Sequence, residues 1–147
     1  MKKMIQIGAG NIGRACVGRL FHKANYKIYF SDVNIELLSM ISDKKYYNVR
    51  MVGKDFDETI NIDNVDKIPE NEKDLLELFD DIEIITTAVG VNILSKIAPF
   101  IVKAIKRKYD TKNEKALNII AWKYEIIACN NSAYMLNCIR GEKHGKI

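Results

Sequence analysis

The segment Ile7-Gly8-Ala9-Gly10-Asn11-Ile12-Gly13 constrains this chain most, because it places a G-x-G-x-x-G pattern between two regular elements. The residues Met4 to Ile7 before it form the apolar run of a short buried strand. After it, apolar residues recur at helical spacing from Ile12 to Ala24. A second apolar run, Tyr26 to Phe30, then follows. This order predicts a strand–helix–strand unit in which the two strands lie parallel.

The three glycines of this loop are expected to play different physical roles. Gly8 permits the tight turn, Gly10 lets the backbone approach a ligand closely, and Gly13 lets the helix pack against the strand. The N–H groups around Asn11 and Ile12 lie at the start of the helix and favour a negative charge. We therefore expect the pyrophosphate of a dinucleotide to bind over Gly8, Ala9, Gly10, Asn11, Ile12 and Gly13.

An acidic residue follows at the distance that a dinucleotide site requires. Asp32 lies 19 residues after Gly13, at the end of the second strand. Its carboxylate can accept hydrogen bonds from a ribose and would repel a 2′-phosphate, which favours NAD over NADP. Val33 is included in the expected site, and Asn34 is expected to cap the next helix. The alternative is that the glycines only make a tight turn and Asp32 caps that helix.

A second wall of the same site is predicted from the run Ile82 to Gly90, the strongest strand pattern in the chain. Ligands of doubly wound sheets bind outside the carboxyl ends of the strands. We therefore expect Ala88, Val89 and Gly90 to line the nicotinamide half of the cofactor site. For Thr86, β-propensity alone is a sufficient explanation.

The remaining patterns predict the fold class. Tyr46 to Val52 and Phe56 to Ile62 are typical of a hairpin at one edge of the sheet, and Leu117 to Ala121 of a further buried strand. Helical spacing recurs after Asn34, after Pro69 and after Gly90, where Pro99 predicts a kink or a late start near Ala98. We expect an α/β fold: a Rossmann-type, doubly wound, mostly parallel sheet with helices on both faces and an antiparallel edge hairpin.

Composition narrows the function classes. The chain has 147 residues, of which 48% are hydrophobic and 29% charged, as expected for one globular domain. The net charge is +4, and its lysine-rich stretch 103–115 is typical of a solvated helix face rather than a nucleic-acid site. Apolar runs are too short to span a membrane, and no signal peptide is expected. The three cysteines lack metal-like spacing, so we expect reduced thiols, a core position for Cys16 and a cytoplasmic protein.

Five segments, taken together in order, resemble a known family. They are Gly8-Ala-Gly-Asn-Ile-Gly-Arg14, Asp32-Val-Asn34, Thr86-Thr-Ala-Val-Gly90, Ile97-Ala-Pro99 and Asn118-Ile-Ile-Ala121. Their order and spacing are similar to the N-terminal domain of the mannitol-1-phosphate 5-dehydrogenases, which are polyol-specific long-chain dehydrogenases. The resemblance covers residues 1–121 and implies NAD as cofactor and D-mannitol 1-phosphate and D-fructose 6-phosphate as the substrate pair.

The resemblance also implies a division of labour between two domains. Members of the family carry a helical second domain that holds the catalytic lysine, and we expect this chain to lack it. The chain is then an NAD(H)-binding domain, residues 1–121, with a divergent segment 122–147, and alone it is expected to be inactive. No catalytic residue is assigned, and Lys123 is expected to be an exposed lysine.

Two alternative functions stay open: a dehydrogenase of another polyol or sugar acid, and a non-catalytic NAD-binding or redox-sensing module. Self-association also stays open.

Overall fold

A five-stranded parallel sheet forms the centre of the molecule. The structure is a computed structural model, and it describes residues 1–122. β1 (Lys2–Ile7) is the middle strand because both of its faces are apolar: Met4 and Ile5 point to opposite faces, and both are fully buried. The other strands are β2 (Tyr26–Ser31), β5 (Val65–Lys67), β6 (Ile82–Thr87) and β7 (Asn118–Ala121). They follow the order β5–β2–β1–β6–β7, and every pair is parallel.

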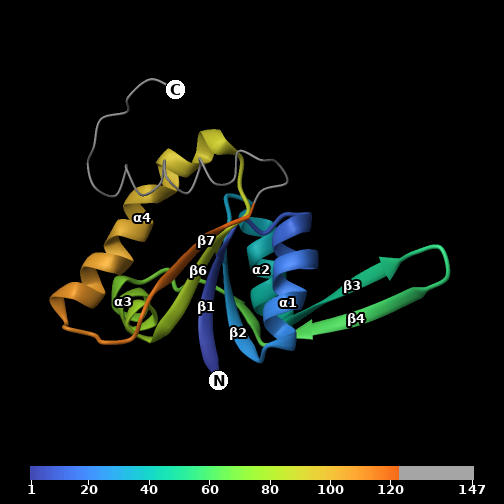
Figure 1. Cartoon of the computed structure of the whole chain (residues 1–147), viewed down its shortest axis with the longest axis horizontal. Helices are drawn as coiled ribbons and strands as arrows, with labels where there is room; N and C mark the ends of the chain where they lie inside the picture. Colours follow the sequence, from blue (N-terminus) through green and yellow to red (C-terminus); the bar gives the residue numbers. More distant parts are fainter. Residues whose placement is uncertain (123–147) are drawn as a thin grey trace.

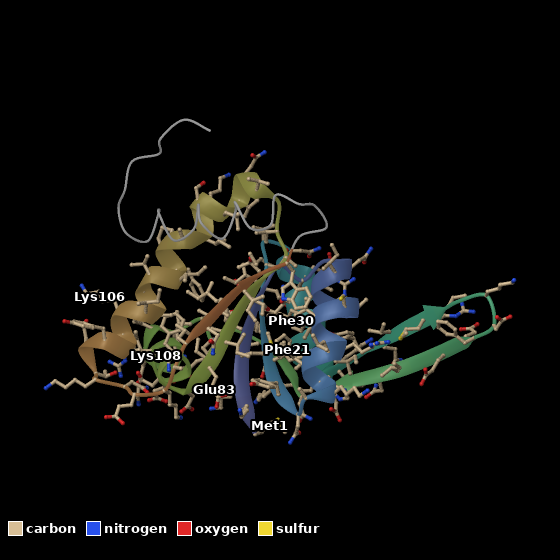
Figure 2. All side chains as sticks on the ribbon, viewed as in Figure 1. Met1, Phe21, Phe30, Glu83, Lys106 and Lys108 are labelled. Atoms are coloured by element: carbon tan, nitrogen blue, oxygen red, sulfur yellow. The ribbon has the colours of Figure 1, made fainter. Side chains whose placement is uncertain are left out.

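Helices cover both faces of this sheet, as the sequence predicts (Figure 1). One face carries η1 (Ile12–Gly18), α1 (Arg19–Lys23) and α2 (Ile35–Lys44), and the other carries α3 (Glu72–Asp81) and α4 (Val91–Asp110). Each face has its own apolar core. Phe21 of α1 and Phe30 of β2 belong to the first core and lie between helix and sheet (Figure 2). Neighbouring residues of β1 alternate between the two cores, which ties the layers together.

The predicted hairpin is present but forms a sheet of its own. β3 (Tyr46–Val52) and β4 (Asp57–Asp63) pair antiparallel and project from the domain (Figure 1). The hairpin was expected at the edge of the main sheet, but that edge is occupied by β5, a strand that the residue pattern does not predict. β5 follows β4 after Asn64, whose φ of 56° turns the chain sharply. The short strand Val65–Lys67 then pairs with β2 and separates the hairpin from the sheet.

One hairpin residue changes the helix that follows the glycine loop. The Tyr47 hydroxyl donates a hydrogen bond of 2.9 Å to the carbonyl of Arg14, and it lies where a Cβ on Gly18 would be only 2.0 Å away. A side chain inserted into a helical ladder in this way widens the turn. The segment Ile12–Gly18 is accordingly π-helical. Partial burial raises the pKa of Tyr47, so this hydroxyl remains a donor.

Because this turn is widened, the burial of residues in the first helix differs from the predicted burial. Val17 and Phe21 are buried, as their spacing predicts, but Ile12 and Leu20 are exposed by 39% and 50%. Cys16, expected in the core, is also exposed. The expectation for Cys16 was wrong because it assumed regular α-helical spacing throughout. The other two cysteines and Lys123 lie outside the described residues.

Two further expectations need revision, and one is confirmed. α4 begins at Val91 and continues through Pro99, so a late start near Ala98 is wrong. The buried residues Leu94, Ala98 and Ile101 keep the same face on the sheet across the proline. β7 is an edge strand and only half-buried, not fully buried as predicted. Asn34 does cap α2, accepting a hydrogen bond of 3.0 Å from the Leu37 N–H.

Asp66 of β5 fastens α2 to the edge of the sheet. Its carboxylate accepts hydrogen bonds from Ser42 (2.8 Å), from Lys45 (2.6 Å) and from the N–H of Lys67 (2.9 Å). Burial alone would raise the pKa of Asp66, but these donors outweigh it and lower the pKa below its usual value. The ionised form therefore stabilises the folded state above the pKa of the unfolded chain, and that contribution is lost as the pH falls through the folded-state value.

We expect Asp66→Asn to lower the free energy of unfolding by about 1 kcal/mol at neutral pH. The difference from wild type should shrink as the pH falls below about 4, where the unfolded carboxyl is already protonated. Urea denaturation at several pH values measures this. Asp55→Asn, an exposed carboxylate between β3 and β4, is the matched control and should have little effect. A deficit that stays constant down to pH 2 would contradict the assignment.

Candidate cofactor-binding site

Gly8 turns the chain out of β1 in a conformation that other residues rarely adopt. Its φ is +93°, and its N–H donates a hydrogen bond of 2.8 Å to the carbonyl of Ser31. A Cβ added to Gly8 would lie 2.5 Å from the carbonyl oxygen of Ala88. Both the backbone angle and this close approach require glycine here. The end of β1 is thereby held between the ends of β2 and β6.

Gly13 and Gly10 have opposite surroundings. A Cβ on Gly13 would lie 2.0 Å from the carbonyl oxygen of Gly8, so Gly13 is what lets η1 pack directly on the turn. A Cβ on Gly10 would meet nothing within 4 Å. Gly10 is exposed, and its open side faces the solvent rather than the protein. Its lack of a side chain therefore serves no packing contact in the described part of the chain.

Asp32 holds the loop from the neighbouring strand. One carboxylate oxygen accepts a hydrogen bond of 2.6 Å from the N–H of Ala9, and the other accepts one of 2.9 Å from the N–H of Asn34. A carboxylate has about four lone-pair positions, so two remain for a ligand. Asp32 thus both braces the glycine loop and offers acceptors at its edge. The sequence spacing predicted its position but not its contact with Ala9.

A cavity of about 400 Å³, here called the loop crevice, opens beside these residues. It lies where the chain order reverses around β1, the usual ligand position in doubly wound sheets. The Ala88 N–H donates a hydrogen bond of 2.8 Å to the Ile7 carbonyl and so joins the end of β6 to the loop. Seven of the predicted residues line the crevice: Gly8, Gly10, Asp32, Val33, Ala88, Val89 and Gly90.

The four other predicted residues belong to the loop but not to the lining of the crevice. Ala9 and Gly13 are buried beneath the loop, whereas Asn11 and Ile12 are exposed at the start of η1. Four lining residues were missed by sequence reasoning: Ile7, Ser31, Ile93 and Ile97. Ile93 and Ile97 lie on α4, and helical spacing cannot distinguish burial in a core from contact with a crevice.

Arg14 braces the outer side of the loop. Its guanidinium donates a hydrogen bond to the carbonyl of Ala9 and lies 3.5 Å from the side-chain oxygen of Asn11. Its own carbonyl is the acceptor for the Tyr47 hydroxyl. The loop is thus held by Asp32 on one side and by Arg14 on the other. Nothing in the glycine pattern itself identifies this second brace.

Within residues 1–122, no cluster of three or more His, Cys, Asp or Glu side chains could hold a metal ion. Within the same range, no helix has the length and hydropathy needed to cross a membrane.

Comparison with known proteins agrees with this geometry. The family model for the mannitol dehydrogenase Rossmann domain matches residues 2–142. Mannitol-1-phosphate 5-dehydrogenase of Buchnera aphidicola subsp. Schizaphis graminum is 35% identical over 126 residues, 86% of this chain and 32% of that protein. The enzyme of the same name from Buchnera aphidicola subsp. Acyrthosiphon pisum (strain Tuc7) is 36% identical over 124 residues, 84% of this chain and 32% of its own length.

The chain therefore spans about a third of the length of these curated relatives. The match extends over nearly all of this chain, and it includes the glycine loop and both walls of the crevice. Rossmann domains of dehydrogenases bind a dinucleotide cofactor. The parallel sheet, the glycine loop and this match together show that the chain belongs to the mannitol dehydrogenase Rossmann-domain family.

Proposed function

We propose that the loop crevice binds NAD(H), with the pyrophosphate over residues 8–13 and the adenosine ribose on Asp32. The observation that carries this proposal is the arrangement of Asp32 and Gly10 on one crevice. Gly10 presents backbone without a side chain, and Asp32 has acceptors left after bonding Ala9 and Asn34. Both features suit a ligand that carries a phosphate next to a ribose.

The charge of the crevice supports NAD over NADP. A 2′-phosphate would lie against the Asp32 carboxylate and be repelled by it. NADP sites usually provide an arginine or lysine for that phosphate. The residues that line the crevice in the described part of the chain include neither. The apolar end formed by Val89, Ile93 and Ile97 suits the less polar nicotinamide half.

For the whole protein, we propose the reaction named by its relatives. An oxidoreductase of this kind would transfer a hydride between D-mannitol 1-phosphate and the nicotinamide, giving D-fructose 6-phosphate. The cofactor supplies the hydride chemistry, and this domain supplies binding and orientation. Such a reaction also needs a base for the hydroxyl proton. We place that base outside residues 1–122 and propose a cytoplasmic location.

Fluorescence titration tests the cofactor proposal directly. Trp122 is the only tryptophan of the chain and packs against the core cluster that contains Ala9. Bound NADH should therefore quench its emission in a saturable way, and NADPH should bind at least about tenfold more weakly because of Asp32, a difference of about 1.4 kcal/mol. Equal affinities for the two cofactors, or no saturable binding of either, would contradict the proposal.

A turnover assay separates binding from catalysis. A protein of these 147 residues, mixed with NADH and D-fructose 6-phosphate, should bind the cofactor but oxidise very little of it, because the lining of the crevice within residues 1–122 includes no lysine or histidine to exchange the hydroxyl proton. The absorbance of NADH over time measures this. The matched control is the same assay with a full-length relative. Robust steady-state turnover by the 147-residue protein would show that the catalytic base lies within it.

A further inference from the structure

Two buried polar side chains lie beneath the glycine loop without a role in the site described so far. Gln6 of β1 and Thr86 of β6 are both fully buried, and they are direct partners in the parallel register of these strands. Polar groups are costly in an apolar core unless they are hydrogen-bonded. Two such residues side by side at the centre of the sheet therefore call for an explanation.

Their hydrogen bonds run from β6 to the loop. The Thr86 hydroxyl donates to the side-chain oxygen of Gln6. The side-chain nitrogen of Gln6 then donates to the carbonyl of Gly8 (3.0 Å) and to that of Ile7 (2.9 Å). Because Thr86 donates to the amide oxygen, it orients the amide so that the nitrogen faces the loop. The two residues form one chain of hydrogen bonds that ends on Gly8.

The carbonyl that receives this bond is central to the loop. It is the atom on which Gly13 packs, since a Cβ on Gly13 would lie 2.0 Å from the Gly8 oxygen and 3.2 Å from the Gln6 nitrogen. The direction of this carbonyl sets the orientation of the peptide that leads to Ala9 and Gly10. Gln6 therefore holds the turn from the inside, while Asp32 and Arg14 hold it from the two outer sides.

We propose that Gln6 and Thr86 are positioning residues that keep the glycine loop in its cofactor-binding conformation. This inference rests on the proposed function of the loop crevice. Neither residue lines the crevice, so both act through the loop and not by touching the cofactor. A precise binding site usually requires that the backbone touching the ligand be held rigid by buried hydrogen bonds.

Four substitutions test this pair by NADH titration and thermal unfolding of the whole chain. Gln6→Leu keeps the volume but loses both donors, and Thr86→Val loses only the hydroxyl. We expect each of these two variants to raise the Kd for NADH about tenfold or more in the folded protein. Thr86→Ser keeps the hydroxyl, so its Kd for NADH should stay within about threefold of the wild-type value. Ile85→Val is the matched control, because Ile85 is equally buried but belongs to the core on the opposite face.

The possible outcomes distinguish a failure of the positioning role of Gln6 and Thr86 from a failure of the proposed function. If the wild-type chain fails to bind NADH, the proposed function falls, and this inference falls with it. If the wild type binds NADH but Thr86→Val and Gln6→Leu bind it within twofold of wild type, only the positioning role is overturned. The role is also overturned if Ile85→Val weakens binding as much as Thr86→Val does at the same loss of Tm. If Gln6→Leu does not fold, the Thr86→Val and Thr86→Ser comparison decides.

Discussion

Replacing Gly10 with alanine is expected to weaken NADH binding by at least about tenfold while leaving the fold intact. The added Cβ would meet no protein atom within 4 Å, and Gly10 lies outside the left-handed region that glycine alone adopts easily. Gly→Ala at such a position stabilises a protein by about 0.4–1 kcal/mol through the unfolded state. In the proposed complex, the methyl group would instead occupy the open side of the loop, where the pyrophosphate is expected to bind.

Gly13→Ala is the matched comparison for this experiment. Its Cβ would lie 2.0 Å from the Gly8 carbonyl oxygen, so η1 would have to move away from the turn. We expect a loss of about 3 kcal/mol in unfolding free energy, at the upper end of overpacking costs, together with the loss of binding. Thermal unfolding and NADH titration of both variants measure the contrast. Unchanged NADH affinity in Gly10→Ala would show that the pyrophosphate does not cross the loop there.

Replacing Asp32 with alanine is expected to reduce NADH affinity and to remove the preference over NADPH. The ribose would lose its acceptor, and a 2′-phosphate would no longer be repelled. The structure adds a second effect: the N–H groups of Ala9 and Asn34 would lose their acceptor. Hydrogen bonds to charged groups contribute about 1.5–3 kcal/mol each, so the variant should also be less stable. Affinity alone therefore cannot separate ribose binding from loop support.

Asp32→Asn separates the two effects. The amide keeps one acceptor oxygen that can receive the Ala9 N–H, but it carries no charge. We expect the ratio of NADH to NADPH affinity to fall about tenfold in this variant, with a smaller loss of Tm than in Asp32→Ala. Parallel titrations with the two cofactors measure the ratio. An unchanged ratio in both variants would show that Asp32 supports the loop without contacting the ribose.

Local residue types were sufficient to predict much of the fold. The strands around the glycine loop, the two-sided helical cover and the cap at Asn34 all follow from short patterns. Errors arose where a distant segment intervened. Regular helical spacing predicts a core position for Cys16, but Tyr47, more than 30 residues later, widens that turn and Cys16 is exposed. The hairpin was placed at the sheet edge because the three-residue strand β5 is too short to produce a periodic pattern.

The candidate site, like the fold, could be predicted from the sequence only in part. The positions of Gly8, Gly10 and Asp32 could be predicted because each depends on a property of one residue: a positive φ, a missing Cβ, or a charge at a strand end. The bracing contacts made by Asp32 and by the Gln6–Thr86 pair could not be predicted, because they join residues far apart in the chain. Thr86 and Gln6 are 80 positions apart, and Asp32 and Ala9 are 23 apart.

The residues of the glycine loop thus specify the backbone geometry of the proposed cofactor site, because the required backbone angles and close approaches are local properties of glycine. Whether the loop is held in that geometry is a tertiary matter. It depends on Asp32 and Arg14 outside the turn and on the Gln6–Thr86 hydrogen bonds beneath it. The Gln6–Thr86 bond exists only after β6 has paired with β1, and the Asp32 bond to Ala9 only after β2 has done so, since a hydrogen bond depends on the final distance between its atoms and not on their spacing in the sequence.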